Sequence, residues 1–115
     1  MNILQAAAVA QAQFTALMAD RGYKTFTTFY GDLTIAEAYG VEGVRDTYRR
    51  VCQEWRNNYK YYTEFVLCLN GKIWQHYKTN EPLARVYDEL WREADAWACS
   101  NLTGEALNHY YDVTD

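Results

Sequence analysis

The sequence predicts an all-α protein: a single compact bundle of about four to six helices with a broadly buried central helix. Apolar residues recur at helical spacing through most of the chain, and capping residues precede several of these runs. Only KTFTTFY, residues 24–30, is rich in strand-forming residues. With 115 residues and 50% hydrophobic content the chain can bury one core, so we expect a single helical domain over 1–115.

The N-terminal part predicts one helix and a connector. Residues 3–20 carry apolar side chains at helical spacing and an alanine-rich face that permits close packing, and Gly22 supplies a stop. We therefore divide the domain into an alanine-rich N-terminal helix, 1–22, and a core, 25–115. KTFTTFY is predicted as a connector, because no second strand is available to pair with it.

Two helices are expected next. Thr34 and Glu37 match a capping box, in which each side chain accepts a hydrogen bond from the backbone amide of the other residue. A short helix would follow and end at Gly40. A longer helix over about 42–57 would bury the apolar residues on one narrow arc: Val44, Tyr48, Val51 and Trp55.

The stretch LCLNGKIWQHY, residues 67–77, combines a thiol, an indole and one of the two histidines. It falls in a predicted helix over 59–78 whose apolar positions cover more than one face, as expected of a central helix. We interpret the stretch as packing, with Cys68 as a small hydrophobe, Gly71 as a point of close helix approach and Trp74 as core.

Two further helices complete the chain. Asn80 is predicted to cap a long helix, and Pro82 is tolerated in its first turn. Its buried stripe comprises Leu83, Val86, Tyr87, Leu90, Trp91, Ala94, Trp97 and Ala98. Two i,i+4 ion pairs are expected on its exposed side, Arg85 with Glu89 and Asp88 with Arg92. A short helix over about 103–111 follows.

Charge is distributed unevenly along a chain of net charge -4. Residues 45–80 carry seven basic and three acidic side chains, whereas residues 81–115 carry two and eight. The acidic total disfavours the whole-surface attraction to phosphate on which sequence-independent nucleic-acid binders rely. The N-terminus lacks a basic region, and glutamines interrupt its apolar residues, so we expect no membrane segment and a cytoplasmic protein.

No catalytic, cofactor-binding or metal-binding site is predicted. Cys52, Cys68 and Cys99 lack the spacing of a zinc site, so we expect reduced, unbridged thiols. Ser100 is the only serine and lies outside a GxSxG-type turn, and the glycines form no phosphate-binding loop. We therefore expect a protein that is not an enzyme and needs no cofactor.

Two groups of side chains make up a candidate interaction surface. One is a basic row on and just beyond the helix over 42–57: Arg45, Arg49, Arg56 and Lys60. The other comprises tyrosines outside the buried stripes, which we expect to be partly exposed: Tyr59, Tyr61, Tyr110 and Tyr111. Tyrosine is favoured at binding surfaces because it contributes large contact area at small entropic cost.

Four segments carry a resemblance to a known group: TFYGDLTIAEAYGVEGVRDTYRR, EWRNNYKYYTEFVLCLNGKIWQHY, LARVYDELWREAD and NLTGEALNHYYDVTD. In them the chain resembles short helical proteins from phages and conjugative elements of gut bacteria, over about residues 25–115. The group brings no activity and no functional residues with it. It implies a context, because accessory proteins of mobile elements commonly bind host or element proteins and include inhibitors of defence nucleases.

Two functional hypotheses follow. The first is a non-catalytic accessory or inhibitor protein of a mobile genetic element, which binds a host or element-encoded protein; its acidic long helix would suit the basic channel of a CRISPR nuclease. The alternative is DNA binding by the arginine-bearing helix over 42–57. That region has the glycine turn and basic helix of a helix-turn-helix motif, but the position usually buried is Asp46. Homo-oligomer formation stays open.

Overall fold

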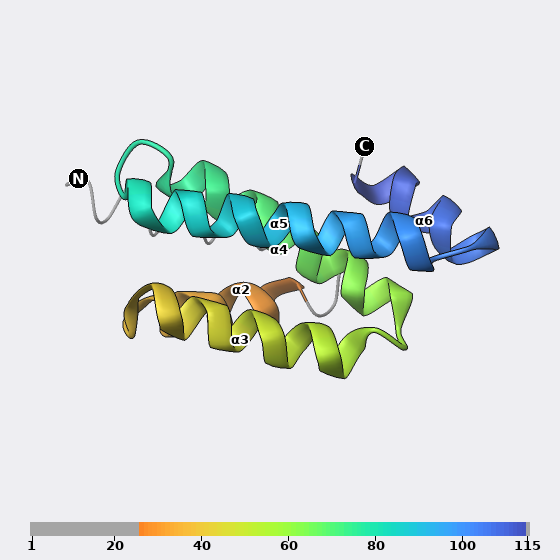
Figure 1. The fold of residues 1–115 in the computed structure, drawn as a ribbon, viewed down its shortest axis with the longest axis horizontal. Coiled ribbons are helices and arrows are strands. Elements are labelled where there is room, and N and C mark those ends of the chain that lie inside the picture. The colour runs from red at the N-terminus through yellow and green to blue at the C-terminus, as the bar shows by residue number, and fades with distance from the viewer. Residues whose placement is uncertain (1–25, 115) are drawn as a thin grey trace.

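The computed structural model describes residues 26–114, and the helix predicted over 3–20 lies outside them. The described chain is all-α and contains no strand, so the predicted fold class is confirmed. Its helices are α2 (Phe26–Glu37), α3 (Gly40–Trp55), α4 (Tyr59–His76), α5 (Glu81–Asn101) and α6 (Gly104–Thr114) (Figure 1).

Helix α4 is the central helix, as predicted. The helices α2 and α3 form one antiparallel pair, α4 and α5 form another, and α6 lies at the end of the bundle where α4 begins (Figure 1). Each of the other four helices packs against α4. The core side chains of α4 are consequently buried on more than one face: Tyr62, Phe65, Val66, Cys68 and Leu69.

Aromatic side chains join the two helix pairs. Phe65 of α4 meets Phe29 of α2 edge to face, with ring centroids 5.4 Å apart, and stacks on Tyr48 of α3 at 6.1 Å. All three are buried. Complete burial of a side chain of this size contributes about 1.5–3 kcal/mol, and favourable ring geometry adds to it.

The prediction of a connector over residues 24–30 is wrong, because α2 begins at Phe26. Phe26, Phe29 and Tyr30 form its first turns rather than a linker, because they and Leu33 share a face that packs on the core. The capping-box prediction is also wrong. Thr34 lies inside α2 and donates from its hydroxyl to the carbonyl of Tyr30 at 2.9 Å.

Two glycines shape the turn between α2 and α3. Gly40 has a φ of +76°, a left-handed conformation that favours glycine, and it begins α3 rather than ending the preceding helix. Gly43 permits a close approach, because a Cβ at this position would lie 2.5 Å from the carbonyl oxygen of Ala36. The tight α2–α3 connection therefore depends on both residues.

Asparagine side chains cap the two longest helices. The prediction for Asn80 is confirmed, since its Oδ1 accepts from the amide of Leu83 at 3.2 Å and proline follows in the first turn. Asn58 caps α4 in the same way by accepting from the amide of Tyr61 at 3.3 Å. These caps place the starts of α4 and α5.

The prediction that Trp74 belongs to the core is wrong, because 65% of this residue is exposed. On α4 it lies two residues from both Lys72 and His76, about 200° around the helix from the side that faces α2. Tyr77 is also exposed, and its ring lies 5.5 Å from that of Trp74. The apolar positions of the central helix thus extend onto an outer face.

Candidate interaction surface

The first half of the basic row is engaged by acidic side chains of the same chain. Arg45 Nη2 lies 3.0 Å from Glu89 Oε2 of α5, and its Nε is 3.8 Å from Glu42. Arg49 pairs with Asp46 at 3.0 Å. The α3–α5 pair uses Glu89, which was expected to pair with Arg85; Arg85 instead contacts Glu81, while the expected Asp88–Arg92 pair forms at 2.9 Å.

The second half of the row lies at the connection between α3 and α4. Arg56 and Lys60 are both exposed, and no carboxylate of the described residues lies within 4.0 Å of either. The Arg56 guanidinium lies over the Trp97 ring of α5, 5.1 Å from its centroid. Such a cation–π contact holds the guanidinium in place without neutralising its charge.

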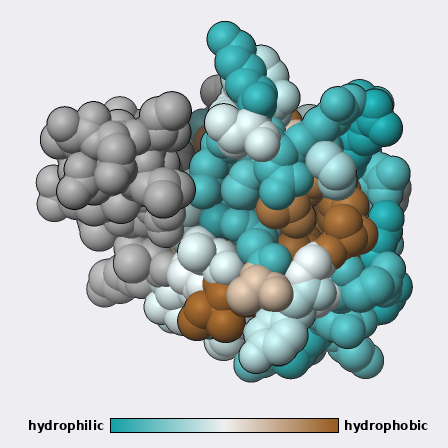
Figure 2. Space-filling view, turned by 90° about the vertical axis from the view of Figure 1, so that its left-hand side faces the viewer, coloured by the Kyte–Doolittle hydropathy of each residue, from teal (hydrophilic) through white to brown (hydrophobic). Residues whose placement is uncertain are grey.

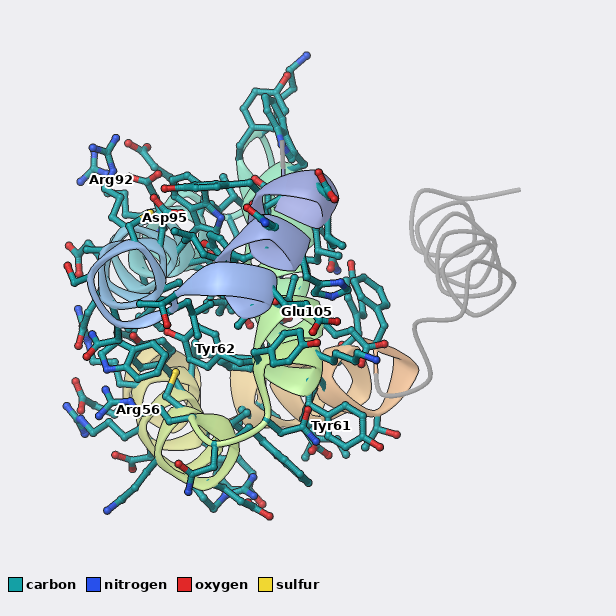
Figure 3. The ribbon with its side chains drawn as sticks, turned by 90° about the vertical axis from the view of Figure 1, so that its right-hand side faces the viewer. Arg56, Tyr61, Tyr62, Arg92, Asp95 and Glu105 are labelled. Carbon is teal, nitrogen blue, oxygen red and sulfur yellow. The ribbon has the colours of Figure 1, made fainter. Side chains whose placement is uncertain are left out.

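Half-buried aromatic rings also occur at the α3–α4 connection. Trp55 meets Tyr61 edge to face at 5.0 Å, and Tyr59 meets His109 of α6 at 5.4 Å. Arg56 and Tyr61 lie on two sides of the α3–α4 connection (Figure 3). We define the α3–α4 corner as this set of residues: Trp55, Arg56, Tyr59, Lys60, Tyr61 and Trp97.

The two tyrosines of α6 differ in exposure. The expectation that Tyr110 is partly exposed is wrong, because this residue is fully buried. Its hydroxyl donates to Asp95 Oδ1 at 2.6 Å. Burial and this carboxylate raise the pKa of Tyr110. Tyr111 is exposed as expected, and its hydroxyl lies 3.8 Å from Cys99 Sγ.

A partly buried ion cluster of Glu37, Lys72, His76 and Tyr87 was not expected from the sequence. Lys72 is fully buried, and its Nζ lies 3.0 Å from Glu37 Oε2 and 2.8 Å from the hydroxyl of Thr34. His76 Nε2 is 3.0 Å from Glu37 Oε1. Since a carboxylate only accepts, this nitrogen must carry the hydrogen. The Tyr87 hydroxyl donates to Glu37 Oε2 at 2.9 Å.

Burial and neighbouring charges shift the pKa values of Glu37 and Lys72 in opposite directions. Burial raises the pKa of Glu37, but the hydrogen bond from His76 and the Lys72 ammonium outweigh burial and leave the pKa below its ordinary value. For Lys72, burial outweighs the attraction of Glu37, so its pKa is lowered. Burial and the Glu37 carboxylate raise the pKa of Tyr87. The cluster ties α2 to α4 and α5.

The ion cluster contains the residue types of an acid–base site, but its polar groups are bonded to one another, as in a structural cluster. Each buried side-chain nitrogen and oxygen in the described residues has a hydrogen-bond partner. The Lys72 ammonium also lies 4.3 Å from the centroid of the Tyr30 ring. One sequence signal was available: Lys72 and His76, four residues apart, share a face of α4. Their acidic partner, Glu37, was not recognised because the sequence predicted that it would take part in a capping box with Thr34.

The cysteines are unbridged, as predicted. Cys52 and Cys68 are buried and Cys99 is exposed. Burial raises the pKa of Cys52 to about 11. The Cys68 thiol donates to the Phe26 carbonyl, at 3.4 Å. Both buried thiols are therefore packed, protonated groups, consistent with the interpretation of Cys68 as a small hydrophobe.

The opposite end of the bundle also carries exposed apolar side chains. Figure 2 views the end that holds the α2–α3 and α4–α5 connections, and hydrophilic residues there divide the hydrophobic surface into separate patches. Ile35 and Tyr39 are exposed beside one connection, and Trp74 and Tyr77 beside the other. Lys78 lies over the Tyr77 ring at this end, with its Nζ 5.4 Å from the ring centroid, and the buried Lys72 of α4 lies over the Tyr30 ring of α2 at 4.3 Å.

No protein family, curated protein or solved structure matches the chain. In the described part of the chain, no helix is long and apolar enough to cross a membrane. The same residues contain no group of three or more histidine, cysteine, aspartate or glutamate side chains placed to hold a metal ion.

Proposed function

We propose that the protein is a non-catalytic protein-interaction protein that docks through the α3–α4 corner. The observation that carries this proposal is that Arg56 and Lys60 are exposed at the α3–α4 connection without a carboxylate partner in the described residues, and that Arg56 lies over the Trp97 ring of α5. Arginine, tryptophan and tyrosine are the residue types that dominate binding energy at protein interfaces.

The engaged arginines favour this function over DNA binding. Arg45, Arg49 and Arg50 each have a carboxylate of the same chain within 4.0 Å. A phosphate would have to displace these carboxylates, in a molecule whose net charge of -4 repels nucleic acid. DNA binding by the arginine-bearing helix therefore remains the alternative that the experiments must test.

The biological setting is part of the proposal and rests on sequence resemblance alone. We place the protein among the accessory or inhibitor proteins of mobile genetic elements, with a host or element-encoded protein as its partner. A defence protein such as a CRISPR nuclease is the target class that this setting favours.

Affinity purification from the native host tests the proposed surface. The wild-type chain is compared with the double variant R56E/K60E and with W74S, which alters an exposed tryptophan on α4 outside the corner. All three altered residues are exposed, so each variant should keep the wild-type circular dichroism and melting temperature.

We expect the wild-type chain and W74S to retain the same partner and R56E/K60E to lose it. A partner retained equally by R56E/K60E would remove the corner from the interface. Recovery of DNA alone, released by salt, would instead favour the alternative function.

A further inference from the structure

We propose that the partner of the α3–α4 corner presents an acidic protein segment, with carboxylates seated on Arg56 and Lys60 and apolar side chains against the neighbouring rings. This inference rests on the proposed function and adds the chemistry of the partner. It follows from the charge at the corner and from the geometry of its rings.

The Arg56 guanidinium is prepared to bind a carboxylate. Its Cζ lies 5.1 Å from the centroid of the Trp97 ring, and no carboxylate of the described residues lies within 4.0 Å of the planar edge that carries its N–H donors. A carboxylate can accept two parallel hydrogen bonds from such an edge. Because Trp97 already restrains the guanidinium, binding costs less side-chain entropy than it would for a free arginine.

The two cations of the corner have no carboxylate of the described residues within 4.0 Å. The first turn of α4 contains no acidic residue and carries Lys60. Of the acidic residues on α5, Glu93 and Asp95 both lie more than 4.0 Å from Arg56, and Asp95 accepts from Tyr110. Asp95 and Glu105 lie on the α5–α6 side of this end (Figure 3). On the α3–α4 side, Arg56 and Lys60 are the groups that would attract an acidic segment.

The ring contacts favour a protein over a nucleic acid. Single-stranded nucleic acid binds by stacking bases on open aromatic faces along a basic groove. Here Trp55 and Tyr61 meet at 74° and Tyr59 and His109 at 73°, so ring faces are packed against ring edges within the protein. Arg56 and Lys60, which have no carboxylate partner among the described residues, would also neutralise few phosphates.

Peptide titration monitored by nuclear magnetic resonance tests the proposal. The probes are a short peptide of alternating Glu and Leu, the matched peptide of Gln and Leu, and an oligothymidylate. The tryptophan indole N–H signals report the site, because Trp55 and Trp97 belong to the corner while Trp74 lies on the outer face of α4.

We expect the Glu–Leu peptide to shift the Trp55 and Trp97 signals and to leave Trp74 in place. R56Q should weaken this binding roughly tenfold, and R56K should recover part of it, because lysine restores the charge but not the paired donors. Equal binding of the Gln–Leu peptide, or no shift of the corner signals, would overturn the acidic partner.

Two outcomes separate this inference from the proposed function. If R56E/K60E loses the native partner while the Glu–Leu peptide fails to bind, the corner remains the interface and the acidic chemistry is wrong. If the oligothymidylate shifts the corner signals at lower concentration than the Glu–Leu peptide, the corner is a nucleic-acid site and both proposals fail.

Discussion

At the residue scale, the ion cluster shows how the buried ammonium of Lys72 is stabilised in the core by a counter-charge. Fully buried Lys72 would be strongly unfavourable without Glu37, and Glu37 in turn accepts from His76 and Tyr87. The pair offsets the desolvation that each ion suffers, so its net contribution to stability is small while the loss of one partner is costly.

Replacing Glu37 should therefore destabilise the fold strongly. E37Q leaves the Lys72 ammonium buried without a counter-charge, and we expect the free energy of unfolding to fall by about 3–5 kcal/mol. The double variant E37L/K72M removes both charges and should recover most of this loss. Urea unfolding measures both; a double variant no more stable than E37Q would contradict the ion-pair explanation.

The same carboxylate should make stability depend on pH. The pKa of Glu37 in the fold lies below its ordinary value of 4.5, so the unfolded chain binds its proton more readily. The stabilisation is complete above pH 4.5 and is lost as the pH falls through the lowered pKa. Unfolding between about pH 6 and pH 3 should show a smaller loss in E37Q than in wild type; equal slopes would exclude Glu37 as the source.

At the element scale, the helices tolerate change according to which face meets the core. Leu69 and Trp74 lie on the same helix and look equally apolar in sequence, yet Leu69 is fully buried and Trp74 is mostly exposed. The contrast arises because α4 packs against helices on several sides and still keeps an outer face.

Alanine substitutions on α4 should separate these two faces. L69A should lower the free energy of unfolding by about 2–5 kcal/mol because it leaves a cavity, whereas W74A should change it by less than about 1 kcal/mol. Chemical denaturation of the two variants measures the difference. A loss of several kcal/mol in W74A would show that its ring is buried in solution.

Two glycines make a matched test of the α2–α3 turn. G43A should destabilise the fold, because the added methyl group would meet the Ala36 carbonyl and the Tyr39 Cβ. G31A adds the same group to α2, where nothing lies within 4 Å, and should stabilise the fold by about 0.5–1 kcal/mol through helix propensity. Thermal melts compare them; equal shifts would argue against a close approach at Gly43.

At the scale of the whole molecule, basic and acidic segments that are far apart in sequence neutralise one another where α3 meets α5. Arg45 and Glu89 are separated by 44 positions and lie 3.0 Å apart. The corner is the part of the basic row that this pairing leaves positive. The surface that we propose for binding is thus what remains after the chain has paired its own charges.

Duplex DNA should bind negligibly near physiological salt. The arginines of α3 are largely paired, and the net charge is -4. Fluorescence anisotropy of labelled duplex across a salt series measures binding, with the triple variant R45A/R49A/R56A as its control. Sub-micromolar binding with a slope near -0.9 per phosphate contact, flattened in that variant, would establish the alternative function.

Features that depend on neighbouring residues could be predicted from the sequence. The spacing of Val44, Tyr48 and Val51 placed the buried side of α3, and Asn80 marked the start of α5, because helical periodicity and capping act over a few positions. The exposed cations Arg56 and Lys60 were identified in the same way, from their position beside a buried arc.

Contacts between side chains across the bundle could not be predicted, because they depend on how the helices pack in the tertiary structure. This packing joined Glu37 to Lys72, buried Tyr110 beneath Asp95 and engaged Arg45 with Glu89, leaving Arg56 on Trp97. Local spacing gives the direction in which a side chain leaves its helix but not the helix that faces it. The partners of a charge, and hence whether it stays available for binding, are set by packing between distant segments.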